Sequence, residues 1–506
     1  MDSPHPSMRT HPGTEVRPRV LLVDPYLCAE DPMERKFVEL YPSLGLLTLG
    51  AYLRSHGCDV EIVDLTFARD TRPVEKGIRD FRPDLLGVHT KTLTCGRAAE
   101  IAQIGRAAGV RTVAGGPDSA SRPDFYLDAG FDFVGMGEGE ATLVALAQGL
   151  AAGTGVVGMP GVVLRRGGRT VRGPARPVLR NLDDLPLPAW DLVDMEGYLR
   201  RWQRKAGERR AAVLTSRGCP FDCSWCSKPT FGRTFRQQSP ERVVRELKAL
   251  RDQYAIDYVR FCDDVFGISR AWLDELLDRM EAADLDLKFE CLARVDLLKP
   301  DLLRRMRAAG LERVYFGVES GSQKMLDLMN RGTKLAQVER AAEALRAEGI
   351  RQFWFLMLGY PGESLADIEA TLQLFRRFSP EEYSVSIAVP VPGTRFHDAV
   401  KDRMAGRSNR TRRAGGKTLL YEAKYPEHLY RWQQARFGLE AALGKTRGKL
   451  SDRVVDRIGH VADRFHERVA TPLLVGDRKP TTDDTSSVEL PLLPSHRRSS
   501  APGPKA

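Results

Sequence analysis

Three cysteines stand close together in the sequence, at Cys219, Cys223 and Cys226 within the segment RGCPFDCSWC. Thiolates bind iron or zinc, and closed structural zinc sites generally take four ligands. The next cysteines, Cys262 and Cys291, stand far along the chain on predicted strands. Three thiolates on a four-iron cluster would leave one iron open to a substrate or cofactor. A zinc knuckle completed by a distant ligand, or ordinary buried cysteines, is the alternative.

The cysteines directly follow a predicted strand at 212–215. Further strands are expected near 258–262, 287–292, 313–318, 352–358 and 383–389, and helices separate them, for example over 240–254. Six strands at this spacing predict a barrel or partial barrel of βα units. In such a fold, ligands bind at the C-terminal ends of the strands, which is where the cysteines lie.

The N-terminal part of the chain predicts a second α/β unit. Strands are expected at 20–23, 60–64, 85–89, 111–114 and 131–135, with helices over about 44–56 and 97–108. This alternation is typical of a doubly wound parallel sheet, which binds ligands beyond the C-terminal ends of its strands. Glycine-rich loops at 115–117 and 137–140 stand at those ends, and glycine permits close approach of the backbone to a bulky ligand.

The chain has 506 residues and a formal net charge of +10. The charge is local, because residues 200–210 carry six Lys/Arg against one Glu, and residues 401–417 carry seven against one Asp. Such clusters are most often solvated faces, and less often docking sites for an anionic substrate, a carrier protein or a reductant. No long apolar stretch or signal-peptide pattern is present, and the eight cysteines are too few for a disulfide framework, so we expect a cytoplasmic protein.

These patterns predict six segments along the chain. They are a flexible leader at 1–17, the first α/β domain at 18–150, a linker at 151–210, the barrel at 211–395, a helical C-terminal region at 396–475, and a disordered tail at 476–506.

Over residues 18–395 the sequence resembles radical S-adenosylmethionine (SAM) enzymes that carry a cobalamin-binding domain. The resemblance rests on the C-x3-C-x2-C spacing and on the segments PSLGLLTLGAYLRSHGCDVEIVD, VAGGPDS and FVGMGEGEAT. It implies an α/β protein with a Rossmann-like cobalamin-binding domain, a partial (β/α)6 radical SAM barrel and a small helical C-terminal region. It also implies three cofactors: a 4Fe-4S cluster on the three cysteines, SAM and cobalamin.

The resemblance further implies which residues contact the cofactors. SAM would contact Asp263, Asp264, Glu290, Arg294, Glu319 and Ser320, although Asp263 or Glu290 alone could equally be a helix cap or a surface carboxylate. Cobalamin would contact Tyr26, Leu44, Gly45, Thr90, Lys91, Thr92, Gly115, Gly116, Glu138, Gly139 and Glu140. The loop after the first strand lacks the Asp-x-His-x-x-Gly motif, so we expect no cobalt-ligating histidine from it. The segment 89–93 is expected at the lower corrin face; His89 is the one candidate ligand there, but a core or loop histidine is the favoured interpretation.

The leading functional hypothesis is methylation of an unactivated carbon of a small molecule. The resemblance implies a 5′-deoxyadenosyl radical, methylcobalamin as methyl donor, and a flavodoxin-like or ferredoxin-like reductant. A second hypothesis keeps these cofactors but makes the reaction an oxidative cyclisation or a rearrangement. A third, an RNA-modifying or RNA-binding protein, is prompted by the basic charge. It is disfavoured because the first domain lacks a second set of three cluster cysteines and no small RNA-binding barrel is evident, so we expect neither a nucleic-acid nor a membrane partner.

Overall fold

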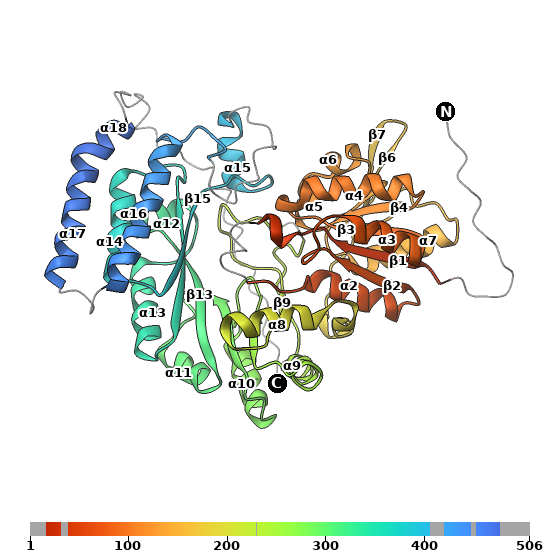
Figure 1. Ribbon diagram of the computed structural model, residues 1–506, viewed down its shortest axis with the longest axis horizontal. Helices are drawn as coiled ribbons and strands as arrows, with labels where there is room; N and C mark the ends of the chain where they lie inside the picture. The colour runs from red at the N-terminus through yellow and green to blue at the C-terminus, as the bar shows by residue number, and fades with distance from the viewer. Residues whose placement is uncertain (1–16, 32–38, 229, 405–418, 447–451, 476–506) are drawn as a thin grey trace, which may run out of the picture.

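The computed structural model describes residues 17–31, 39–228, 230–404, 419–446 and 452–475. Two α/β units lie side by side, and a helical layer covers the outer side of the second (Figure 1). The expected tail at 476–506, nearly all of the expected leader and most of the basic segment 401–417 lie outside the described residues.

The first unit is built on a seven-stranded sheet. Its strand order is β2 (Asp59–Asp64), β1 (Arg19–Asp24), β3 (Leu85–His89), β4 (Arg111–Gly115), β5 (Phe133–Gly135), β6 (Val162–Arg166) and β7 (Arg169–Arg172). The first five strands are parallel, as the sequence predicts. Helices cover both faces, which is why successive residues such as Val20, Leu21 and Leu22 are all buried. These helices are α2 (Leu44–Ser55), α3 (Arg72–Phe81), α4 (Cys95–Ala107), α5 (Pro117–Ser121), α6 (Pro123–Asp128) and α7 (Glu140–Ala151).

The segment expected to be a linker contributes to both units. Strands β6 and β7 form an antiparallel hairpin on the edge of the first sheet, so this sheet extends past residue 150 to Arg172. Helix α8 (Met195–Ala206) follows, and its Met195 and Leu199 pack into the core of the second unit. Most of the first basic segment therefore lies on α8, whose apolar side is buried.

The second unit is a six-stranded, all-parallel sheet. Its order is β15 (Glu382–Ile387), β14 (Arg351–Leu358), β13 (Leu311–Glu319), β12 (Lys288–Ala293), β11 (Tyr258–Phe261) and β8 (Arg210–Val213). The helices between the strands are α9 (Pro240–Tyr254), α10 (Arg270–Ala282), α11 (Pro300–Ala308), α12 (Gln323–Leu328), α13 (Leu335–Ala347) and α14 (Leu365–Phe378). Strand order follows chain order, which is the topology of a partial (β/α)6 barrel and confirms the predicted fold class.

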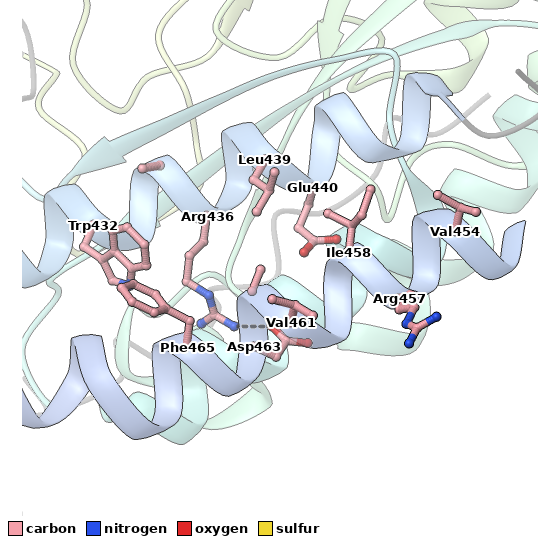
Figure 2. Close-up of a pocket in the computed structure, with 12 residues that line it drawn as sticks. Trp432, Arg436, Leu439, Glu440, Val454, Arg457, Ile458, Val461, Asp463 and Phe465 are labelled. Carbon is pink, nitrogen blue, oxygen red and sulfur yellow. Dashed lines mark hydrogen bonds and ion pairs between the residues drawn. The ribbon is translucent and has the colours of Figure 1, made fainter. Parts of the chain in front are cut away.

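The C-terminal region is helical. After α15 (Arg395–Val400), helix α16 (Glu427–Thr446) packs on α14 and β15, and α17 (Asp452–Phe465), a π-helical turn (His466–Ala470) and α18 (Thr471–Val475) follow. Figure 2 shows the groove between α16 and α17, where apolar side chains such as Leu439 and Val461 gather around the ion pair of Arg436 with Asp463. Among the described helices, none has the length and apolar character needed to cross a membrane.

Glu246 on α9 gives a test of the packing between the two units. Its side chain is buried near the segment 187–191, and burial raises its pKa to about 7, with Arg242 opposing the rise. The folded protein therefore holds a proton on Glu246 between about pH 4.5 and 7 that the unfolded chain releases, so stability falls as pH rises through this window.

We predict that Glu246→Gln stabilises the protein at pH 8 by on the order of 1–3 kcal/mol relative to wild type, and changes little at pH 4.5. Urea unfolding at both pH values measures the difference. Glu275→Gln is the matched control, because Glu275 is an exposed partner of Arg279 on α10. An equal effect of Glu246→Gln at both pH values would contradict a buried, protonated Glu246.

Candidate functional site: two strand-end clusters that face each other

The three clustered cysteines lie on one loop of the barrel, between the short strands β9 (Ser216–Arg217) and β10 (Arg236–Gln237). Hydrogen bonds from two distant segments and one within the loop fix its position. Ser224 N donates to Met329 O at 2.9 Å, and Phe396 N donates to Ser224 O at 3.0 Å. The Lys228 ammonium donates to Cys219 O at 2.7 Å. The loop is therefore held by segments that follow β13 and β15, far away in the sequence.

All three thiols are free and lie close enough to influence one another. Burial raises the pKa of Cys219 and raises that of Cys226 to about 11, and the neighbouring cysteines add to both rises. Within the described residues, no three His, Cys, Asp or Glu side chains form a group suited to a metal ion. A four-iron cluster places each thiolate on a different iron, so its ligands surround it rather than meet at one point. Three thiol donors match three of the four irons of such a cluster.

Asp263 ties the second barrel strand to the start of the cysteine loop. Its Oδ1 accepts hydrogen bonds from Thr215 N at 3.1 Å, from Thr215 Oγ1 at 3.0 Å and from Ser216 Oγ. Burial raises its pKa to about 6, and these hydrogen bonds oppose the rise. Oδ2 is buried and has no hydrogen-bond partner among the described residues, so it can accept one from a bound amino or hydroxyl group. Asp264, beside it, keeps a solvent-exposed side chain. Partial loss of hydration raises its pKa, and the positive charge of Lys228 opposes the rise.

The third and fourth strand ends brace the same loop. Arg294 is buried, donates to Asp296 and to Arg331 O, and lies 3.7 Å over the ring of Phe221 in the cysteine loop. Glu319 ends β13 with a left-handed backbone (φ 62°), and burial raises its pKa to about 7. Ser320 is fully buried and bonds Thr371 Oγ1 at 3.1 Å. The contacts of Arg294 and Ser320 are thus internal, and direct contact of these residues with SAM stays a prediction.

Glu290 lies within β12 and not at its C-terminal end. It is fully buried and accepts hydrogen bonds from Arg313 Nη2 at 2.6 Å, Tyr258 OH at 3.0 Å and Tyr315 OH at 3.3 Å. Arg260 lies 3.5 Å away. Both carboxylate oxygens therefore have partners inside the barrel, where Glu290 neutralises buried cations, and its contact with SAM stays a prediction.

Arg331 belongs to the site, although no motif in the sequence singled it out. Its Nη1 donates to Cys223 Sγ at 3.5 Å and its Nη2 donates to Gly317 O at 3.3 Å. The one local signal is the turn Asn330-Arg331-Gly332, in which both neighbours have positive φ. A turn of this kind indicates a fixed backbone, but it does not reveal which side chain meets a cysteine.

The glycines of the first sheet leave room for a large ligand. Gly116 has φ 121°, and a Cβ there would lie 2.7 Å from Thr90 O, so only glycine fits. At Gly115 and Gly45 a Cβ would meet no atom within 4 Å. Open backbone at the C-terminal edge of the sheet suits a bulky corrin. Thr90 itself is buried and donates to Gly115 O at 3.0 Å, so it shapes this edge from inside.

Polar and charged side chains surround His89 at the end of β3. His89 Nδ1 lies 3.2 Å from Ser43 Oγ and 3.7 Å from Asp24 Oδ2, and Lys91 Nζ lies 3.6 Å from the same oxygen. Burial alone would raise the pKa of Asp24, but the hydrogen bond from His89 and the charge of Lys91 hold it at about 2. The ammonium of Lys91 lies 6.0 Å from the ring centre of Tyr26.

The other predicted cobalamin contacts lie around the same edge. Thr92 donates to Asp118 Oδ1 at 2.8 Å, Leu44 packs against the core of the barrel, and Gly139 precedes α7. Cobalamin contact from these residues stays a prediction.

Glu138 and Glu140 join the two units. Arg217 Nη2 lies 2.6 Å from Glu140 Oε1, and Arg236 Nη1 lies 2.7 Å from Glu138 Oε1. All four side chains are buried, and Leu179 N donates to Glu138 Oε2 at 2.7 Å. Both carboxylates thus connect the glycine-rich loop of the first unit to the base of the cysteine loop, and their contact with cobalamin stays a prediction.

Comparison with known proteins places this arrangement. The radical SAM superfamily model matches residues 213–375 and the B12 binding domain model matches residues 34–147. An uncharacterized methyltransferase from Pyrococcus horikoshii is 31% identical over 388 residues, covering 75% of this chain and 82% of that protein. The chain belongs to the radical SAM superfamily and carries a B12 binding domain.

The chain is also similar to two further proteins of known activity or structure. The anaerobic magnesium-protoporphyrin IX monomethyl ester cyclase of Rubrivivax gelatinosus is 28% identical, over 72% of this chain and 67% of the cyclase. The radical SAM methyltransferase TsrM from Kitasatospora setae, solved with cobalamin and a [4Fe-4S] cluster bound, has the same fold with a TM-score of 0.65. It is 22% identical, over 78% of this chain and 76% of TsrM.

The buried ion pairs give a stability prediction. We expect Arg217→Met to destabilise the protein by about 3–5 kcal/mol, because Glu140 loses its partner while it remains buried. Urea unfolding measures the loss. The variant that combines Arg217→Met with Glu140→Gln should recover part of the stability, since it removes the carboxylate that is left unpaired while Glu138 keeps Arg236 as its partner.

Arg54→Met is the matched control for this prediction. Arg54 pairs with Asp191 at 2.6 Å, but both side chains are largely exposed, so its loss should cost less than about 1 kcal/mol. Equal losses in Arg217→Met and Arg54→Met would show that burial of the junction adds nothing.

Proposed function

We propose that this protein is a cobalamin-dependent radical SAM methyltransferase that methylates an unactivated carbon of a small molecule. The observation that carries the proposal is the buried junction of Glu138 and Glu140 with Arg217 and Arg236. Arg217 stands two residues before Cys219, and Glu138 stands in the glycine-rich loop after β5. The two cofactor loops are therefore adjacent, as methyl transfer between two cofactors and one substrate requires.

The donor groups of the site suit each cofactor. When bound, the cluster, SAM and cobalamin supply one-electron chemistry and a transferable methyl group. Cys219, Cys223 and Cys226 would hold the cluster, and Asp263 Oδ2 would accept a hydrogen bond from SAM. The open backbone at Gly115 and Gly45 would receive the corrin. Lys228 and Arg331 place positive charge beside the three thiols.

The similarity to the porphyrin-ester cyclase supports a second candidate, an oxidative cyclisation with the same cofactors. Methylation is favoured because the Pyrococcus protein, which this chain covers more completely and at higher identity, is named a methyltransferase, and because TsrM has the same two-domain fold. The proposal also includes a flavodoxin-like or ferredoxin-like protein as the electron donor, an acidic carrier protein as a further partner, and a cytoplasmic location. The structure describes residues 401–404 of the second basic segment, and the rest of this segment lies outside the described residues.

We predict that Cys219→Ala, Cys223→Ala and Cys226→Ala each abolish cluster binding and the formation of 5′-deoxyadenosine. Anaerobic reconstitution, iron analysis and chromatography of the nucleoside products measure the two effects. Cys58→Ala is the control, because Cys58 is buried in the first unit and should leave iron content unchanged. Retention of wild-type iron and nucleoside formation in the three variants would overturn the proposal.

A substrate-independent assay separates methyl transfer from cyclisation. We predict that reduced holoprotein incubated with methyl-deuterated SAM forms S-adenosylhomocysteine and moves the label to the cobalamin fraction. Mass spectrometry of both fractions measures the transfer. Formation of 5′-deoxyadenosine without any S-adenosylhomocysteine would instead favour the cyclisation hypothesis.

A further inference from the structure

Arg331 makes a contact with the cysteine loop that no cofactor motif explains. Its guanidinium reaches Cys223 Sγ at 3.5 Å through Nη1 and Gly317 O at 3.3 Å through Nη2. The same guanidinium lies 5.8 Å from the ring centre of Trp225, which also belongs to the loop. One side chain from the segment after α12 thus connects β13 with the middle cysteine.

The structure around Arg331 is built to hold the guanidinium in place. Glu319 is buried next to it, and the two interact electrostatically. Glu319 adopts a left-handed backbone, which strains a non-glycine residue and persists only where its surroundings require it. A Cβ at Gly317 would lie 2.1 Å from Glu319 Oε1 and 2.8 Å from Arg331 Nη2, so a larger residue there would displace both side chains.

The other cations described near the loop bond to oxygen atoms. The Lys228 ammonium donates to the carbonyl oxygens of Cys219 and Phe221, and Arg395 pairs with the Asp222 carboxylate at 2.8 Å. Among the described residues, Arg331 is the cation that donates a hydrogen bond to one of the three cysteine sulfurs. Hydrogen bonds and positive charge at cluster sulfurs stabilise the more negative, reduced cluster and raise its reduction potential.

We propose that Arg331 is a positioning residue that sets the reduction potential of the cluster through its hydrogen bond to Cys223, with Glu319 and Gly317 fixing its geometry. This inference rests on the proposed function in that it takes Cys223 as a cluster ligand. It goes further by assigning the control of electron uptake to a residue outside the cysteine motif.

An EPR-monitored redox titration of the reconstituted protein measures the midpoint reduction potential of the cluster. Arg331→Met should shift the midpoint to more negative values, and Arg331→Lys, which keeps the charge, should restore part of the shift. Iron content and circular dichroism of both variants should match wild type. An unchanged midpoint in Arg331→Met with full iron content would overturn the proposal.

Arg395→Met is the matched control, because it removes a cation that contacts the same loop at Asp222 and not at a sulfur. It should shift the midpoint potential clearly less than Arg331→Met does. Equal shifts in both variants would overturn the proposal, since they would assign the effect to general loosening of the loop. A midpoint shift specific to Arg331→Met in a protein that forms no S-adenosylhomocysteine would contradict the proposed function and leave this inference standing.

Discussion

The buried ion pairs of Arg217 with Glu140 and of Arg236 with Glu138 are the contact on which the rest of the site depends. Four charges removed from water are tolerated only when each has a close partner of opposite sign, so this contact fixes the relative position of the two loops that carry them. One loop ends β5 of the first sheet, and the other leads directly into the cysteine motif. A cofactor held by either unit therefore faces the other unit at a set position.

A single glycine extends this constraint into the cysteine loop. Gly218 stands between Arg217 and Cys219 with φ 78°, and a Cβ there would lie 2.3 Å from Thr234 O. The chain must turn at this point because β9 pairs with β10, which carries Arg236. The hairpin thus holds both arginines of the junction and the first cysteine in one rigid piece. Arg294, at the end of β12, and Arg331, in the segment after α12, then brace the far side of the loop.

The interior of the barrel is more polar than its strand pattern suggests. Glu290 accepts hydrogen bonds from Arg313, Tyr258 and Tyr315. Glu39 of the first unit forms an ion pair with Arg260 at 2.8 Å. The indole Nε1 of Trp202 donates a hydrogen bond to Leu40 O, next to Glu39, at 2.8 Å. Segments of both units therefore meet at this polar cluster as well as at the junction of the two loops.

The sequence by itself determined the two α/β units, the order of their main strands and the three cysteines, because hydrophobic periodicity and residue spacing are local properties of the chain. It also located the glycines at the strand ends, since bare backbone is visible in the residue type alone. Only the tertiary structure decided what the charged residues do. Glu138, Glu140 and Glu290 stand in cofactor-like positions in the sequence, but their partners come from segments 23 to 98 residues away. The contact of Arg331 with Cys223 likewise spans 108 residues. A carboxylate or a guanidinium takes whichever opposite charge folding brings to it, and no local pattern specifies that partner.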